Sequence, residues 1–533
     1  MDKKIEQYNI LYKVLKKLDN EILKHYNRNE ISDNDYFFDG INSDIFSNTL
    51  NILTNYLSGN IESAGVDLSC RAIIEAMVIL KMHENGAITE NQKRIYRYLY
   101  AYVDIDNFHS IIHDIETTPF DKSIKRLESD KEKAKQAMLA HFRCTENDLK
   151  NRKISIDDPC FYLKTKLNDD IRFVKLLEKY PLGDGNEIKF YEFFSLFIHP
   201  RCETNYKFEV GLMELRRKHY VEEVLNYVIN YLKQNNLFEY DKNSLDFNDD
   251  FFYNPQFITN VKLVKDVEKL IHLTKNQICN LPSGYDAFIW QFLEKVRYLI
   301  IDMIISLTFG YNEHVIACFK PFIEEYSIFY AINLVESEKD FEYLKKGYLI
   351  SSRIQLSNHF QKLGQTDLFI SETEIKDLYE NYYKDKYKMD DYDSFHAELT
   401  KNSLFFLSKE RKSFNKHVRT LIESIFDDDI DESKDIMTLY RISKDMCHAS
   451  GYNFNATTGM VNIAAHKTLF YTYKLINYFV INVFKSLKEK GIKNEENNIV
   501  SFLETMMNFH KAEVKRISNE QIENALKWKN QKN

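Results

Sequence analysis

The chain of 533 residues is poor in glycine, proline and tryptophan. It contains only 14 Gly, 7 Pro and 2 Trp, and this scarcity of turn-forming residues disfavours an all-β fold. The seven cysteines are an odd number, and no two lie within four residues of each other. This spacing predicts neither a zinc finger nor a disulfide framework. We therefore expect the protein to lie in a reducing cytoplasm and to bind no metal and no other cofactor.

The sequence also lacks a long hydrophobic run. The two most apolar segments, 299–309 and 473–484, are shorter than the roughly 20 residues that span a membrane, and Asp302 interrupts the first. The N-terminus has no apolar stretch typical of a secretion signal. Glycine-rich phosphate loops, dinucleotide fingerprints and zinc-protease or serine-hydrolase motifs are absent. These absences predict a cytoplasmic protein without a membrane partner.

Positive charge is not in excess. The net charge is −8, from 72 Lys and Arg against 80 Asp and Glu, so no global basic field points to nucleic acid. Hydrophobic residues make up 44% and recur at helical spacing, which predicts an all-α fold. The expected helices span 44–57, 63–83, 124–142, 190–198, 221–233, 288–307, 315–333, 435–448, 475–485 and 499–529.

Four polar positions of the first half recur in the second half 249 residues later. The pairs are Arg71 and Lys320, Glu75 and Glu324, Tyr191 and Tyr440, and His199 and His448. A period this long predicts a duplicated domain rather than a solenoid of short repeats. We therefore expect two homologous helical bundles, a linker and a terminal helix that caps the structure or contacts a protein partner. Their predicted limits are 1–240, 256–494, 241–255 and 495–533.

The repeated cation and carboxylate are four residues apart, so each pair shares one helix face. A charge on an apolar helix must be paired. One interpretation is an ion pair that fixes the helix register. The other is an anion site, in which Arg71 binds a phosphate and Glu75 orients it; Lys320 and Glu324 would be its altered copy. Pro321 predicts that the second helix kinks or restarts there.

Each half also places a tyrosine eight residues before a histidine. Tyr191 and His199, like Tyr440 and His448, form a stripe along about two turns of helix. A buried Tyr–His pair is common in protein cores. Alternatively, the stripe faces the Arg/Glu helix across a polar pocket, where the histidine acts as a general acid or base and the cation stabilises negative charge.

The second half has an additional signal, an arginine with six residues between it and a histidine. Arg441 and His448 have this spacing, which is similar to the Arg-x(4–6)-His signature of HEPN-like helical domains. That superfamily includes metal-independent ribonucleases. The resemblance implies that Arg441 binds the scissile phosphate and His448 assists proton transfer. In the first half, Glu192 occupies the position that corresponds to Arg441.

A second resemblance covers both halves. Arg-x3-Glu followed by Tyr-x3-Ser-x3-His resembles the bacterial domain-of-unknown-function 5677 family, and the first half carries the full pattern in Arg71, Glu75, Tyr191, Ser195 and His199. The second half departs from it at Lys320 and Lys444. This resemblance implies an all-helical fold and no particular activity.

Two functions remain open from the sequence. The first is a HEPN-like, metal-independent ribonuclease or nucleotide-acting effector, with RNA or a nucleotide as its partner, in bacterial stress or phage defence. The second is a non-catalytic binding or scaffold protein whose repeated polar sets are structural. The sequence alone does not decide whether the protein is an enzyme.

Overall fold

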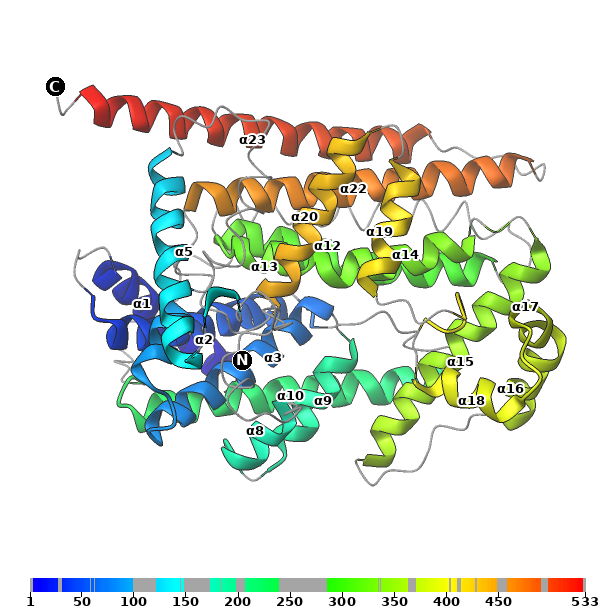
Figure 1. Ribbon diagram of the computed structural model, residues 1–533, viewed down its shortest axis with the longest axis horizontal. Helices are drawn as coiled ribbons and strands as arrows, with labels where there is room; N and C mark the ends of the chain where they lie inside the picture. The colour runs from blue at the N-terminus through cyan, green and yellow to red at the C-terminus, as the bar shows by residue number, and fades with distance from the viewer. Residues whose placement is uncertain are drawn as a thin grey trace.

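The computed structural model is built from α-helices, and no β-strand occurs among the residues it describes (Figure 1). The all-α prediction is therefore confirmed. The structure describes residues 3–26, 31–57, 59–61, 63–98, 121–143, 145–147, 173–183, 185–197, 207–238, 285–333, 335, 337–362, 371–401, 404–409, 414–426, 429–447, 458–489 and 497–530.

The helices fall into two sets along the chain. The first set comprises α1 (Lys3–Tyr26), α2 (Asp33–Leu57), α3 (Ala64–Glu84), α5 (Asp121–Phe142), α8 (Phe173–Lys179), α9 (Glu187–Phe197) and α10 (Lys207–Gln234). The second set comprises α12 (Tyr285–Phe309), α13 (Asn312–Ala317), α14 (Phe319–Asn333), α15 (Glu338–Lys362), α16 (Glu372–Leu378), the π-helical turn η4 (Tyr379–Tyr383), α17 (Lys384–Tyr387), α18 (Tyr392–Lys401), α19 (Phe414–Ile425), α20 (Ile430–Met446), α22 (Thr458–Glu489) and α23 (Asn497–Asn530).

Three predicted helix starts were wrong by more than ten residues, while that of α3 was correct within one residue. Ser63 caps α3 by accepting a hydrogen bond from the Gly65 backbone N–H. Helix α2 begins at Asp33 rather than at 44, because the Ser32 hydroxyl accepts from the Asp35 backbone N–H and provides a start signal. Helix α10 begins at Lys207 rather than at 221. Helix α22 begins at Thr458 rather than at 475.

The break that Pro321 predicts in this helix is present, but it lies at Cys318, three residues before the expected position. Helix α13 ends at Ala317, and Cys318 separates it from α14, which starts at Phe319. Pro321 therefore lies in the first turn of α14. A proline is tolerated there because the first backbone N–H groups of a helix have no partner within it.

The buried apolar residues form two clusters. One is built mainly from the first set of helices and the other mainly from the second. Two buried residues belong to the cluster of the other set: Leu68 of α3 lies in the second cluster, and Tyr311 lies in the first. The predicted linker at 241–255 lies outside the described residues, and the duplication stays a prediction.

The two sets of helices meet where α2 and α3 contact α12 and α13. At the opposite edge, the long α23 runs along α22 over much of its length (Figure 1). The C-terminal helix thus packs against its own chain, as one of its two predicted roles requires.

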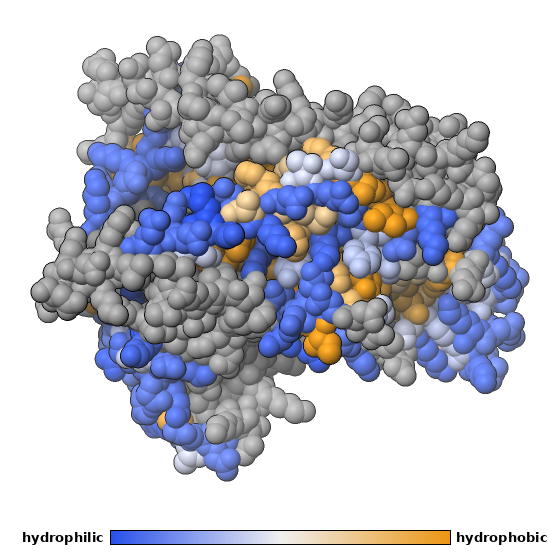
Figure 2. Space-filling model, turned by 90° about the horizontal axis from the view of Figure 1, so that it is seen from above, coloured by the Kyte–Doolittle hydropathy of each residue, from blue (hydrophilic) through white to orange (hydrophobic). Residues whose placement is uncertain are grey.

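Among the residues coloured in the view from the α23 side, hydrophilic residues predominate, and most of the apolar ones gather near the centre of that face (Figure 2). The most exposed large apolar side chains of the described residues include Ile430 at 78% and Leu215 at 68% exposure. Among the described helices, none combines the length and the apolar character that crossing a bilayer requires.

Candidate functional site

In the first half, Arg71, Glu75 and Tyr191 form one hydrogen-bonded cluster. Arg71 Nε donates to Glu75 Oε1 at 3.0 Å, and the Tyr191 hydroxyl donates to the same oxygen at 3.0 Å. The Arg71 guanidinium also lies 5.3 Å from the centre of the Tyr191 ring. Helix α3 therefore carries the ion pair, and α9 supplies the phenol that caps it. These contacts agree with the sequence-based expectation that Tyr191 faces the helix of Arg71 and Glu75.

The second half repeats this arrangement with weaker contacts from its cation. Lys320 Nζ lies 3.5 Å from Glu324 Oε2, and the Tyr440 hydroxyl donates to Glu324 Oε1 at 2.8 Å. In each half the tyrosine follows its glutamate by 116 residues. Lys444, on the next turn of α20, has its ammonium 5.9 Å from the Tyr440 ring centre. The lysine supplies a point charge where the arginine supplies a planar fork.

These clusters are buried. Glu75 and Glu324 are each 2% exposed, whereas the side chain of Arg71 is 14% exposed. Burial and the neighbouring Glu324 raise the pKa of Tyr440 far above its ordinary value, so its hydroxyl keeps its proton as a donor. A glutamate buried to this extent is held in place by its donors rather than by water.

The Arg71 cluster is connected to the C-terminal end of α20 through α13. Burial alone lowers the pKa of the Arg71 guanidinium, but the nearby Tyr191 and Glu75 more than offset this and hold it above its ordinary value. The Cys447 thiol adds to the same effect. The Cys447 thiol also contacts the Ala317 carbonyl at the end of α13, which packs against α3. Helix α3 and the end of α20 therefore both pack against α13, between the two halves.

The remaining predicted site residues divide into two groups. Arg441 is exposed, on α20. His199 and His448 lie outside the described residues, directly beyond the ends of the described parts of α9 and α20. Their position opposite the Arg/Glu helices stays a prediction.

Removing either phenol tests how much each cluster stabilises the fold. We expect Tyr191→Phe and Tyr440→Phe each to lower the free energy of unfolding by about 1–3 kcal/mol, because each leaves a buried carboxylate short of a donor. Urea unfolding followed by circular dichroism measures this. The matched control is Tyr326→Phe, since the Tyr326 hydroxyl is buried without a hydrogen-bond partner. A loss for the control as large as for the other two would contradict the assignment.

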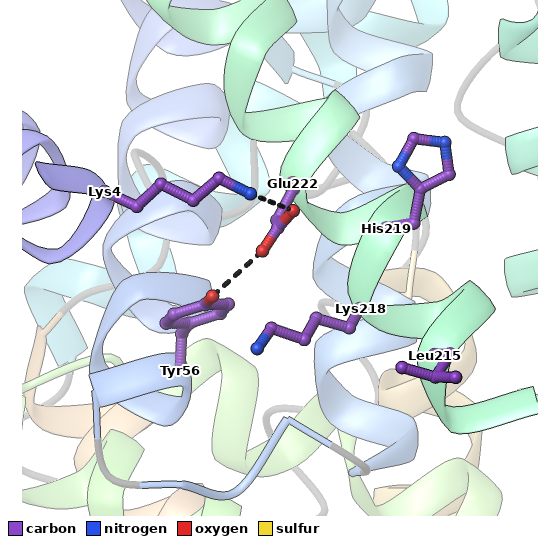
Figure 3. A pocket seen from close by; sticks show the side chains of 6 residues that line it. All are labelled: Lys4, Tyr56, Leu215, Lys218, His219 and Glu222. Atoms are coloured by element: carbon purple, nitrogen blue, oxygen red, sulfur yellow. Dashed lines mark hydrogen bonds and ion pairs between the residues drawn. The ribbon is translucent and has the colours of Figure 1, made fainter. Parts of the chain in front are cut away.

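A shallow hollow on the described surface offers a different kind of site (Figure 3). It lies between α1, α2 and α10. Lys4 pairs with Glu222 at 2.8 Å, and the Tyr56 hydroxyl donates to the same carboxylate at 3.0 Å. Lys218 lies 5.8 Å from the Tyr56 ring centre. Lys4 neutralises Glu222 and Tyr56 donates a hydrogen bond to it, so Lys218 is the one lining lysine for which no ion pair is seen among the described residues. A single lysine in a shallow hollow does not define a ligand.

Sequence reasoning missed a buried polar cluster between the two halves. Asp302 of α12, His314 of α13 and Cys318 after α13 lie together, with 0%, 8% and 0% exposure. Their ligand-type atoms all lie within 4.8 Å of one another. One signal was in the sequence: Asp302 interrupts an otherwise apolar helix. The other is that His314 and Cys318 are four residues apart, which places them on one helical face.

The same cluster joins the halves through reciprocal hydrogen bonds. The Asn55 amide of α2 donates to Asp302 at 2.9 Å, and the Ser306 hydroxyl of α12 donates to Asn51 at 2.8 Å. Asp302 and Ser306 lie 251 positions after Asn51 and Asn55, respectively. The contacts are crossed, because Asp302 pairs with Asn55 and Ser306 pairs with Asn51. Such a crossed exchange is what two helices related by an approximate twofold axis make.

The chain matches no protein-family model, and comparisons with curated proteins and with solved structures likewise give no match.

Proposed function

We propose that this protein is a metal-independent ribonuclease or nucleotide-acting effector of the HEPN-like kind, acting in bacterial stress or phage defence. The observation that supports it is the exposure of Arg441 on α20, a helix whose C-terminal end contacts α13, which in turn packs against α3. That end carries the exposed Arg441 and leads directly into His448. In the proposed site, Arg441 and His448 supply a cation and an imidazole from the second half and Arg71 supplies a cation from the first, as a phosphate-binding site between paired helical domains requires.

In this proposal each residue has a defined task. Arg441 binds the scissile phosphate, and an arginine suits this task because its planar fork contacts two phosphate oxygens at once. His448 transfers the proton, since an imidazole titrates near neutral pH. Arg71, held by Glu75 and Tyr191, supports the site with positive charge from the other half. His199 would perform the equivalent proton transfer in the first half.

The experiment is incubation of the purified protein with total RNA in the presence of a metal chelator. We expect cleavage by the wild-type chain and at least a hundredfold slower cleavage by the variant His199→Ala plus His448→Ala, since acid–base catalysis contributes about 10²–10⁴-fold. Absence of cleavage by the wild type, or cleavage by the double variant at the wild-type rate, would remove the proposal.

A second function is favoured by the burial of the clusters. Glu75 and Glu324 are each 2% exposed, which suits internal struts in a non-catalytic binding or scaffold protein. In that case, alanine in place of either histidine lowers the melting temperature. In the ribonuclease, the same substitution removes activity with little loss of stability. Measuring both quantities on one set of variants separates the two functions.

A further inference from the structure

The buried Asp302, His314 and Cys318 present three different donor atoms to one point. His314 Nε2 lies 3.2 Å from Asp302 Oδ1 and 3.4 Å from Cys318 Sγ, and Cys318 Sγ lies 4.0 Å from Asp302 Oδ2. Zinc held tetrahedrally by N, O and S ligands at about 2.0–2.3 Å places those atoms about 3.4–3.6 Å apart. The observed separations lie around this range, although His314 is measured to Asp302 Oδ1 and Cys318 to Asp302 Oδ2; with one oxygen for Asp302, all three atoms lie within 4.8 Å of one another.

The geometry is unsuited to a catalytic triad. In such a triad, the nucleophile and the carboxylate contact opposite nitrogens of the imidazole. Here the thiol and the carboxylate both lie against Nε2 of His314. Cys318 is also fully buried, so a substrate would not reach its sulfur. The mutual closeness of one nitrogen, one sulfur and one carboxylate oxygen, all within 4.8 Å of one another, is what ligands around one ion require.

The surrounding residues hold the three donors in place. The Ser69 hydroxyl lies 3.2 Å from Nδ1 of His314, which suits a hydrogen bond that leaves Nε2 free to bind a metal. Asp302 accepts from the Ser63 hydroxyl at 2.7 Å and from the Asn55 amide at 2.9 Å. Metal-binding histidines and carboxylates are characteristically oriented in this way by a second layer of hydrogen bonds.

Space for the cluster is provided by Gly65 of α3. A Cβ atom at this position would lie 1.8 Å from Asp302 Oδ2 and 2.8 Å from Cys318 Sγ. The absence of a side chain at Gly65 therefore lets α3 approach Asp302 and Cys318 closely. A fourth donor is also near: the Asn51 side-chain amide lies 2.9 Å from His314 Nε2. Rotation of this amide by half a turn would direct its oxygen to the same point.

We propose that Asp302, His314 and Cys318 bind one zinc ion at the junction of the two halves. The mixed N, O and S donor set favours zinc over magnesium or calcium, which prefer oxygen alone. On binding, the Cys318 thiol releases its proton to solvent and coordinates as the thiolate. This proposal departs from the sequence-based expectation of no metal. It is independent of the proposed nuclease chemistry, which uses no metal.

The test is the zinc content of the full-length protein, loaded with excess zinc and passed over a chelating resin. We expect about one zinc per chain in the wild type, and loss of this zinc in Cys318→Ser and in His314→Ala. The matched control is Cys70→Ser, another buried cysteine, on α3. Zinc retained by Cys318→Ser, or no stoichiometric zinc in the wild type, would overturn the proposal.

Cobalt substitution keeps the proposal testable if Cys318→Ser does not fold. Cobalt(II) in the wild-type chain should give a thiolate-to-cobalt charge-transfer band, because the proposed site contains one cysteine. The band should persist when each of the other cysteines is separately changed to serine. A cobalt-loaded protein without this band, or a band that disappears with any of those other cysteines, would contradict the assignment.

Discussion

Replacing Arg217 with methionine should lower the free energy of unfolding by about 3–5 kcal/mol. Arg217 of α10 is 4% exposed and contacts Asp67 of α3 through two atoms. Its Nε lies 3.2 Å from Oδ1, and its Nη2 lies 3.1 Å from Oδ2. The large cost arises because the substitution leaves the Asp67 carboxylate, which is fully buried, without its cation. Urea unfolding at neutral pH measures the loss.

Two further variants define the mechanism of this loss. The double variant Arg217→Met plus Asp67→Leu should recover much of the stability, because it removes the orphaned charge. Arg94→Met is the matched control, since Arg94 also pairs with an aspartate, Asp33, but its side chain is 55% exposed. The control should change stability by about 1 kcal/mol or less. Equal losses from Arg217→Met and the control would show that burial of the pair is unimportant.

Acid should destabilise the contact between α22 and α23. His466 Nδ1 lies 3.0 Å from His510 Nδ1, so one ring donates to the other only while at least one ring is neutral. Burial lowers the pKa of His466 to about 4 and that of His510 to about 3, from an ordinary value of 6.5. The nearby protonated His466 lowers the pKa of His510 further.

The sign of the pH dependence follows from these directions. Between pH 6.5 and about 4 the unfolded chain binds protons on both rings, while the folded chain does not. The free energy of unfolding therefore falls as the pH falls, by on the order of 3 kcal/mol for one such ring. The groups that face the pair include Glu513, which opposes the shift of His466, and Arg516, which adds to it.

Unfolding in urea at pH 7 and pH 4 measures this effect. We expect the variant His466→Asn plus His510→Asn to lose several kcal/mol less than the wild type between the two pH values. The control is His219→Asn, because the side chain of His219 is 61% exposed. A wild type and a double variant with the same pH dependence would show that this pair does not titrate as described.

The sequence predicted those features that depend on local pattern. The Ser63 cap set the start of α3, and the spacing of Arg71 and Glu75 placed them on one face. The repeat then indicated which tyrosine each glutamate contacts, and both of these contacts are present. Local pattern was enough to predict these contacts because the same residues recur at the same spacing in both halves of the chain.

The contacts between distant segments were not predictable in the same way. Helical periodicity shows which face of α12 is buried, but not that Asp302 meets Asn55 and Ser63 from the other half. The His466–His510 pair likewise depends on how α23 lies along α22. A single polar residue in an apolar helix indicates that a partner exists, and only the packing of the helices identifies it.

The most direct test of the proposed function compares RNA cleavage by Arg441→Ala and Arg419→Ala. Both arginines are exposed, on the neighbouring helices α20 and α19, so their loss changes the net charge equally and should change stability little. We predict that Arg441→Ala cleaves RNA at least a hundredfold more slowly than the wild type, whereas Arg419→Ala keeps the wild-type rate. Equal rates for the two variants would contradict the assignment of the phosphate-binding role to Arg441.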